Sequence, residues 1–372
     1  MQLSREQLQK IDQSKNRILI DWFSFSSRID SFDSMTALLG MSDCKWEVLP
    51  GVMGYKERYY YQGISIHVGG YNCRRFAGTD KEQLVTGVWL EMSGSGCRSF
   101  ETYGCGDWQQ LIDYCNFNSE NITINRVDLA YDDFLGYLNI DAIAEDTRKH
   151  NFVSKFRSAP EIIESIGETE TAVTVTHGRM KSDVFIRIYD KRLEQNAADI
   201  FSHWVRNEVM LRHERAAAAV YLLGDQYDYK DGVRYPIAPA KPVDELYFMI
   251  MNNYLRFIVP SGTDTNRWRA PVADHWANFC DSITTYRISL FSAPGTDYSA
   301  LRLDNYVENV CSGVIYTYIK LHGVEKLIEV CQSKTYKLAE KYRKLLVDAV
   351  EEDKTIGQVL WEEVIFGGSE SE

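Results

Sequence analysis

Alternating runs of β-branched or aromatic residues and polar residues constrain the fold of this chain most. They predict strands, and helical patterns fall between these runs. Residues 18–116 have the order strand, helix, group of strands, helix, and residues 122–223 repeat it. The predicted strands are Ile18–Ser26, Tyr59–Gly69, Gly87–Ser93, Ile122–Asp132, Ala172–His177, Val184–Lys191 and Trp204–Arg212, and the predicted helices are 34–40, 108–116, 140–149, 161–166 and 214–223.

This repeated order suggests an internal duplication. The two halves share little sequence beyond an acidic residue in each first strand, Asp21 and Asp128. A chance similarity of element order is therefore an open alternative.

The pattern changes after residue 223. A loop rich in Asp, Tyr, Gly and Pro covers residues 224–242, and helical patterns follow at 243–259, 275–282, 303–322 and 324–353. We expect an α+β fold with an antiparallel-rich β-sheet core, helices on one side, and a helical carboxy-terminal region. The predicted division is a catalytic domain of residues 1–240 and a helical region of residues 241–372.

Charge limits how this chain can contact nucleic acid. Its formal net charge is -12, and phosphate neutralisation needs a basic surface. A protein that coats nucleic acid non-specifically is excluded, so any DNA contact requires a local basic patch. No apolar run approaches the roughly 20 residues that span a bilayer, so we expect no membrane partner and a cytoplasmic location.

The segment Ile186–Arg192 contains the strongest candidate for a nucleophile. On a strand, Arg187, Tyr189 and Lys191 would point to the same side. Nearby cations favour a phenolate over a phenol with its ordinary pKa of about 10, and they also attract a phosphodiester. A tyrosine in this setting is suited to covalent attack on DNA, although a surface strand with solvated cations would show the same pattern.

Acidic residues inside two other predicted strands suggest a metal site. Asp128 and Asp132 share one strand face, and Glu208 shares a face with Arg206. Carboxylates in apolar strands need a cation, a hydrogen bond or a metal. Ion pairs, such as Glu208 with Arg206 or Arg187, are the alternative explanation.

The metal chemistry is restricted by what the chain lacks. Its histidines form no H-x-H or H-E-x-x-H pair, and its cysteines no C-x-x-C pair. Oxygen ligands therefore favour Mg²⁺ or Mn²⁺. The Gly94–Arg98 segment lacks the Lys and Ser/Thr of a nucleotide-binding loop, and we expect it to form a tight turn that presents Arg98.

Five ordered segments carry a family resemblance: Ile20–Phe25, Gly94–Arg98, Arg126–Asp133, Ser182–Lys191 and His203–Glu208. Together they resemble the Rep_trans replication initiation factors, which rolling-circle plasmids of Gram-positive bacteria encode and which conjugative transposons use as relaxases. The resemblance covers residues 18–280. It implies that Tyr189 is the nucleophile and that the acidic metal site falls on Asp128, Glu208 and either Asp132 or Asp21.

The resemblance implies a metal-dependent nicking and closing enzyme that leaves a 5′-phosphotyrosine at an origin, with Arg187 and Lys191 stabilising charge. Its partners would be single-stranded or hairpin origin DNA, a host helicase and, in a homodimer, a second copy. The expected DNA contacts are Arg98, Arg179, Lys181, Arg192 and Arg206. A hydrolytic metal nuclease and a non-catalytic origin-binding protein are the alternatives.

Overall fold

The structure is a computed structural model, and it describes residues 3–69, 87–166, 170–230, 233–260, 266–280, 307 and 312–332. The chain forms two compact units, Met1–Ala293 and Pro294–Glu372. In the second unit the described helices are α11 (Ser312–His322) and α12 (Val324–Gln332). The remainder of the predicted helices 303–322 and 324–353 lies outside the described residues.

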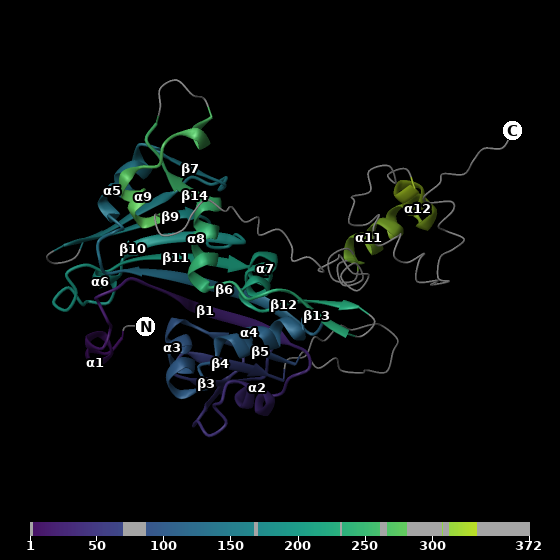
Figure 1. The fold of residues 1–372 in the computed structure, drawn as a ribbon. Helices are drawn as coiled ribbons and strands as arrows, with labels where there is room; N and C mark the ends of the chain where they lie inside the picture. The colour runs from purple at the N-terminus through teal and green to yellow at the C-terminus, as the bar shows by residue number, and fades with distance from the viewer. Residues whose placement is uncertain are drawn as a thin grey trace. The chain divides into compact units, whose positions relative to one another are not determined.

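An antiparallel sheet of ten strands forms the frame of the first unit (Figure 1). Its spatial order is β2-β3-β4-β5-β1-β6-β11-β10-β9-β8. These strands are β1 (Arg17–Ser27), β2 (Glu47–Pro50), β3 (Glu57–Tyr61), β4 (Ile64–Val68), β5 (Val88–Met92), β6 (Ile122–Asp133), β8 (Glu161–Ile166), β9 (Thr171–Gly178), β10 (Val184–Asp190) and β11 (Val205–Arg212). The predicted antiparallel-rich sheet is confirmed.

The sheet has an approximate twofold axis at its centre, where β1 pairs with β6. Phe23 faces Val127 at the midpoint, and a register irregularity follows on each side. The axis relates β1 to β6, β5 to β11, β4 to β10, β3 to β9 and β2 to β8. The chain therefore repeats one topology twice, which supports the internal duplication.

Helices cover one face of this sheet. Strand alternation directs Phe23, Val127, Leu129, Ile186 and Val209 into the core under them, each fully buried. The opposite side carries Asp128, Arg187, Tyr189, Arg206 and Glu208, and we call it the polar face. The helices of this unit are α1 (Arg5–Gln9), α2 (Phe32–Leu38), α3 (Gly94–Tyr103), α4 (Trp108–Phe117), α5 (Ile140–Arg148), α6 (Lys191–Glu194), α7 (His213–Leu223), α8 (Val243–Tyr254) and α9 (Asp274–Cys280).

Two segments expected to be helical form strands instead. Residues 161–166 are strand β8, because pairing with β9 outweighs a weak local helical pattern. The predicted helix 243–259 stops at Tyr254, and β14 (Leu255–Phe257) then pairs with β7 (Phe152–Ser154). Tertiary pairing decides both cases.

Other differences concern turns and a boundary. The run 59–69 is a hairpin that bends at Gln62 and Gly63, both with positive φ. Residues 224–242, expected to be a loop, contain a hairpin of β12 (Gln226–Lys230) and β13 (Val233–Ala238). The compact unit extends to Ala293 rather than 240, because α8 buries residues such as Leu246 and Ile250 in the sheet's core.

Candidate active site

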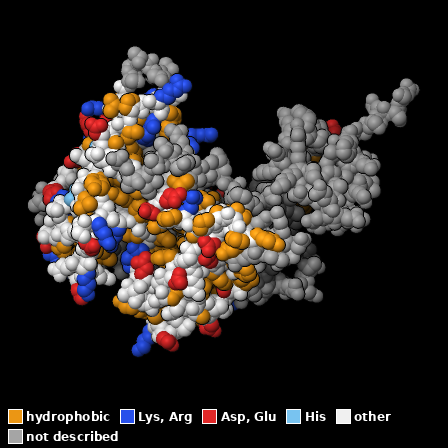
Figure 2. Space-filling view, viewed as in Figure 1, with side chains coloured by type: hydrophobic (Ala, Val, Ile, Leu, Met, Phe, Trp, Pro, Cys, Tyr) orange, Lys and Arg blue, Asp and Glu red, His pale blue; other side chains and the backbone are white. Residues whose placement is uncertain are grey.

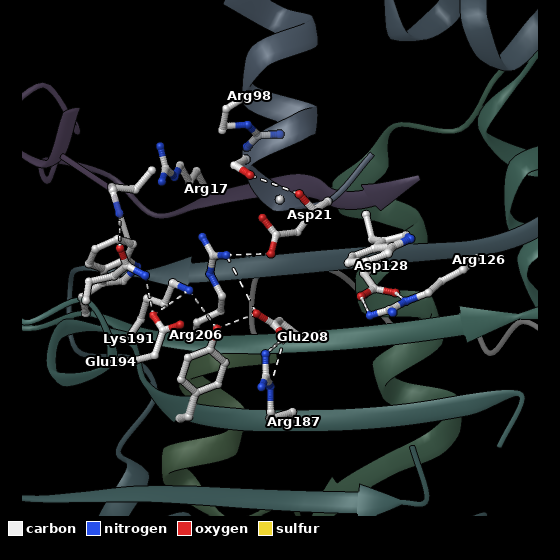
Figure 3. A pocket seen from close by; sticks show the side chains of 18 residues that line it. Arg17, Asp21, Arg98, Arg126, Asp128, Arg187, Lys191, Glu194, Arg206 and Glu208 are labelled. Atoms are coloured by element: carbon white, nitrogen blue, oxygen red, sulfur yellow. Dashed lines mark hydrogen bonds and ion pairs between the residues drawn. The ribbon is translucent and has the colours of Figure 1, made fainter. Parts of the chain in front are cut away.

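One pocket collects most of the predicted site residues. Its volume is about 270 Å³, and it lies where β1 extends past the end of β5, beside the N-terminal turn of α3 (Figure 3). The polar side chains that line it come from β1, β6, β10, β11, α3 and α6. They are Arg17, Asp21, Ser93, Ser95, Arg98, Arg126, Asp128, Arg187, Tyr189, Lys191, Glu194, Gln195, Arg206 and Glu208.

Tyr189 lies in this pocket, held by polar contacts on both sides. Its hydroxyl donates to Glu208 Oε1 at 2.6 Å and accepts from Lys191 Nζ at 3.1 Å. The Arg187 guanidinium lies 4.5 Å from the ring centroid. Lys191 begins α6 rather than ending the strand, yet it still reaches the tyrosine, so the predicted trio does come together.

The protonation of Tyr189 differs from the sequence-based expectation. Burial and the negative charge of Glu208 raise the pKa of the phenol well above its ordinary value, against the lowering effect of Arg206 and Arg187. The tyrosine is only 4% exposed, so desolvation outweighs the flanking cations. In this structure the nucleophile candidate is therefore held as a phenol.

Glu208 and Arg206 connect the strands beneath the pocket. Glu208 Oε2 accepts from Arg187 Nη2 at 2.6 Å, so the ion pair considered from the sequence does form. Arg206 contacts Asp21 at 2.9 Å and Asp132 at 2.6 Å. Figure 3 shows Arg206 reaching from β11 toward Asp21 on β1, with Glu208 between Arg206 and Arg187.

Asp132 does not join the pocket. Its side chain has no exposed surface, and its carboxylate accepts from Arg206, Arg17 and Trp204. Although burial opposes it, the two arginines hold the pKa of Asp132 well below its ordinary range. Asp132 is thus a buried counter-ion, and the expectation that it binds a metal does not fit its surroundings.

Asp128 occupies another side of the pocket. Arg126 binds both its oxygens, at 2.8 and 2.5 Å, and the same guanidinium lies 4.0 Å from the ring centroid of Trp22. Burial raises the pKa of Asp128 to about 6, and the charges of Glu208 and Asp21 add to this effect against Arg126. The three acids therefore lie near enough to repel one another.

Asp21 is brought to the site by a local irregularity. It sits at the register shift of β1, between Ile20 and Trp22. A Cβ at Gly94 would lie 2.9 Å from Asp21 Oδ1, so a glycine there lets the first turn of α3 approach the carboxylate. The Gly94–Arg98 segment is the start of this helix, capped by Ser93, and not the predicted tight turn.

The acids of the pocket are of the kind that bind Mg²⁺ or Mn²⁺. Asp21, Asp128 and Glu208 offer hard oxygen ligands, and their mutual repulsion is what a divalent ion would relieve. As they stand, each is paired with an arginine. Within the described ranges, no three His, Cys, Asp or Glu side chains stand close enough to hold one ion. The oxygen ligands are suited to a divalent ion, but the ion pairs between the three acids and their arginines would have to open for it to bind.

The expected DNA contacts fall into separate places. Arg98 and Arg206 line the pocket, where Arg98 pairs with Glu101 and Arg206 is buried. Arg192 pairs with Glu170 and Asp190. Arg179 and Lys181 are exposed in the turn between β9 and β10, at the other end of β10 from Tyr189. In Figure 2 basic and acidic side chains are interspersed over the face shown.

Sequence reasoning missed several lining residues. Arg126, Trp22 and Glu194 were not selected, since nothing in the sequence shows which strands lie side by side. The approximate twofold axis places Trp89 and His67 at the positions of Glu208 and Arg187, and their rings stack at 4.1 Å. The Arg187–Glu208 pair therefore has no counterpart in the first half, which contributes Asp21 and Arg98 to the pocket instead.

Known proteins that are similar to this chain are replication initiators and a DNA relaxase. Residues 122–331 match the family model described as replication initiation factor. A Bacillus subtilis (strain 168) protein named as a DNA relaxase, NicK, is 26% identical over 275 residues, 70% of this chain and 71% of that protein. The structure of a rolling circle replication initiator protein from Geobacillus stearothermophilus has a TM-score of 0.59 and 25% identity, covering 74% of this chain and 99% of that one.

Proposed function

The chain belongs to the replication initiation factor family, and on that premise we propose that it nicks and rejoins origin DNA through a covalent bond to Tyr189. Members of this kind are rolling-circle initiators and DNA relaxases. The observation that carries the proposal is the Tyr189 hydroxyl, set in a pocket between Glu208 and Lys191 with Arg187 beside the ring.

The contacts of Tyr189 support a role for each neighbour. Glu208 accepts the phenol hydrogen bond and is placed to take its proton. The phenol oxygen then forms a bond to phosphorus as the bond to the 3′ oxygen breaks, and the departing oxygen takes up a proton. Lys191 and Arg187 stabilise the charge that develops on the phosphate. Because the phosphotyrosine keeps a phosphoester bond, the strand can be resealed without ATP.

A divalent ion is part of the proposal. Asp128 and Glu208, with Asp21, would hold Mg²⁺ or Mn²⁺, which when bound supplies Lewis-acid polarisation of the scissile phosphate.

The substrate is single-stranded or hairpin origin DNA, since the tyrosine lies in a pocket of about 270 Å³. A helicase partner and a homodimer remain proposals. In the part of the chain that the structure describes, no helix is long and apolar enough to cross a membrane.

The test is incubation with labelled single-stranded origin oligonucleotide and Mn²⁺, followed by a denaturing gel. A protein–DNA adduct that resists denaturation supports the tyrosine mechanism. Cleavage without an adduct would instead indicate a hydrolytic nuclease. DNA binding without cleavage under any metal would indicate a non-catalytic origin-binding protein.

Asp128→Asn should remove cleavage while leaving the fold intact. With a folded pKa of about 6 against an ordinary value near 3.8, the ionised carboxylate costs stability above pH 6, and this cost disappears as the pH falls through 6 toward 4. Removing the charge should therefore keep or raise the free energy of unfolding at pH 8, by up to about 1–3 kcal/mol.

Denaturant unfolding and nicking assays on the same preparation measure both effects. Glu164→Gln, an exposed acid on β8 outside the pocket, is the matched control and should change neither. An Asp128→Asn protein that loses stability but keeps specific activity would show that the acid serves only its ion pair with Arg126.

Gly94→Ala should slow nicking without destabilising the protein. The added Cβ would meet Asp21 Oδ1 at 2.9 Å, so the carboxylate must shift. Alanine is favoured over glycine inside a helix by roughly 0.5–1 kcal/mol, so the melting temperature should hold or rise. Single-turnover nicking rates report the effect. A normal rate would mean that Asp21 has no part in the reaction.

A further inference from the structure

A second pocket lies at the opposite end of β10 from Tyr189. Its volume is about 630 Å³. The segment after β7, the turn between β9 and β10, and single residues of α7 and α8 form its walls. The lining residues are Lys155, Phe156, Arg157, Ser158, Gly178, Arg179, Ser182, Asp183, Val184, Arg215 and Tyr254.

The charge of this pocket is unusual for so acidic a chain. Four cations and one carboxylate line it, whereas the formal charge of the whole chain is -12. Arg157 and Arg179 are exposed, and in the described ranges neither forms an ion pair. In the candidate active site, by contrast, Arg187, Arg206 and Arg126 are each bound to a carboxylate. The second pocket therefore offers positive charge to an external anion.

Packed aromatic side chains form one wall of this pocket. Phe156 and Tyr254 lie with ring centroids 5.8 Å apart, and Lys155 Nζ lies 5.9 Å from the Tyr254 centroid. Gly178 has φ +90°, and a Cβ there would meet the Phe156 ring at 2.9 Å. This glycine lets the aromatic wall close against the end of β9. The hydroxyls of Ser158 and Ser182 add hydrogen-bond donors beside the cations.

We propose that this pocket holds the phosphate backbone of DNA at a distance from the nick, as a second contact site that fixes the substrate's direction along the sheet. Guanidinium, ammonium and hydroxyl donors are the groups that bind phosphodiesters. Along β10, Val184 and Tyr189 lie roughly 17 Å apart at about 3.4 Å per residue. This is the shortest path, because Tyr189 lies on the polar face whereas α7 and α8, which help to line the second pocket, cover the other face. One strand of a duplex spans it in at least about five nucleotides. The inference rests on the proposed function, because it takes DNA as the ligand.

The test is the salt dependence of DNA affinity in the full chain. Arg157→Ala with Arg179→Ala removes two phosphate contacts, so the slope of log affinity against log salt should fall by about two, with a loss of at least about tenfold in affinity at low salt. The probe is a fluorescein-labelled duplex of about 30 base pairs and arbitrary sequence, since phosphate contacts are independent of sequence. Arg157→Lys with Arg179→Lys keeps both charges and should keep the slope.

Arg148→Ala with Lys149→Ala is the matched control. It removes the same charge from the C-terminal end of α5, where both side chains already pair with Glu145, and the slope should not change. An unchanged slope in the Arg157/Arg179 alanine variant would overturn the proposal. So would loss of inorganic phosphate binding, measured by calorimetry, with duplex affinity intact, since the pocket would then hold a free anion.

Adduct formation, measured on the same proteins, separates the two proposals. A wild-type adduct together with an unchanged slope in the alanine variant overturns the second site and leaves the nicking function standing. A lowered slope in a protein that never forms an adduct supports the second site and removes the tyrosine mechanism.

Discussion

Replacing Tyr189 by phenylalanine will abolish nicking and adduct formation, by a factor of at least about 10³, while DNA affinity stays nearly unchanged. Only the hydroxyl is lost. The ring still packs under Arg187, and Glu208 keeps its ion pair with that residue. The lost hydrogen bonds should cost about 0.5–1.5 kcal/mol of stability. Labelled oligonucleotide on a denaturing gel measures the adduct, and fluorescence anisotropy measures binding.

Tyr131→Phe is the matched control for this result. Tyr131 is also a buried tyrosine, and its hydroxyl bonds Asn16 at 2.7 Å, but it lies on β6 and faces the helices instead of the pocket. The same chemical change there should leave nicking intact. An adduct that persists in Tyr189→Phe would remove the central claim and direct attention to another nucleophile.

Strand alternation explains why much of the site could be predicted. Period-two spacing placed Tyr189 with Arg187 and Glu208 with Arg206 on shared faces, and the ladders confirm both pairs. The same spacing puts Val127, Leu129 and Tyr131 on the side opposite Asp128 and Asp132, where they join the core. Which side of the sheet a residue faces depends only on its position along its own strand, so the sequence of that strand is enough to predict it.

The parts that could not be predicted depend on contacts between distant strands. Asp132 and Asp128 share a face, yet β11 brings Arg206 opposite Asp132. Asp132 therefore becomes a buried counter-ion, whereas Asp128 lines the pocket. The cation-flanked tyrosine suggested a lowered pKa, but burial raises it. Residues 161–166 became β8 through pairing with β9. In each case the three-dimensional surroundings outweigh the local pattern.

Arg206→Met should be the most destabilising of these changes. Arg206 is 5% exposed and Asp132 has no exposed surface, and the variant leaves that carboxylate with Arg17 and Trp204 alone. Breaking one side of a buried ion pair typically costs about 3–5 kcal/mol. Denaturant unfolding at pH 7 measures the loss. Arg148→Met, an exposed control on α5, should stay within about 0.5 kcal/mol of wild type.

Removing both charges distinguishes this network from a DNA contact. In Arg206→Met with Asp132→Leu the fully buried carboxylate is removed together with its partner, and only the partly exposed Asp21 loses its arginine, so much of the lost stability should return. The stability of the wild-type protein depends on pH through Asp132, because the pKa of this acid is lowered in the folded state. The stabilisation by the ionised Asp132 is fully present above its ordinary pKa near 3.8 and is lost as the pH falls through the folded pKa. In Arg206→Met the acid can take up a proton instead, so the difference from wild type should shrink between pH 7 and pH 4. If Arg206→Met folds with wild-type stability and loses only DNA affinity, Arg206 acts as the DNA contact expected from the sequence, and the buried network is not what holds β1, β6 and β11 together.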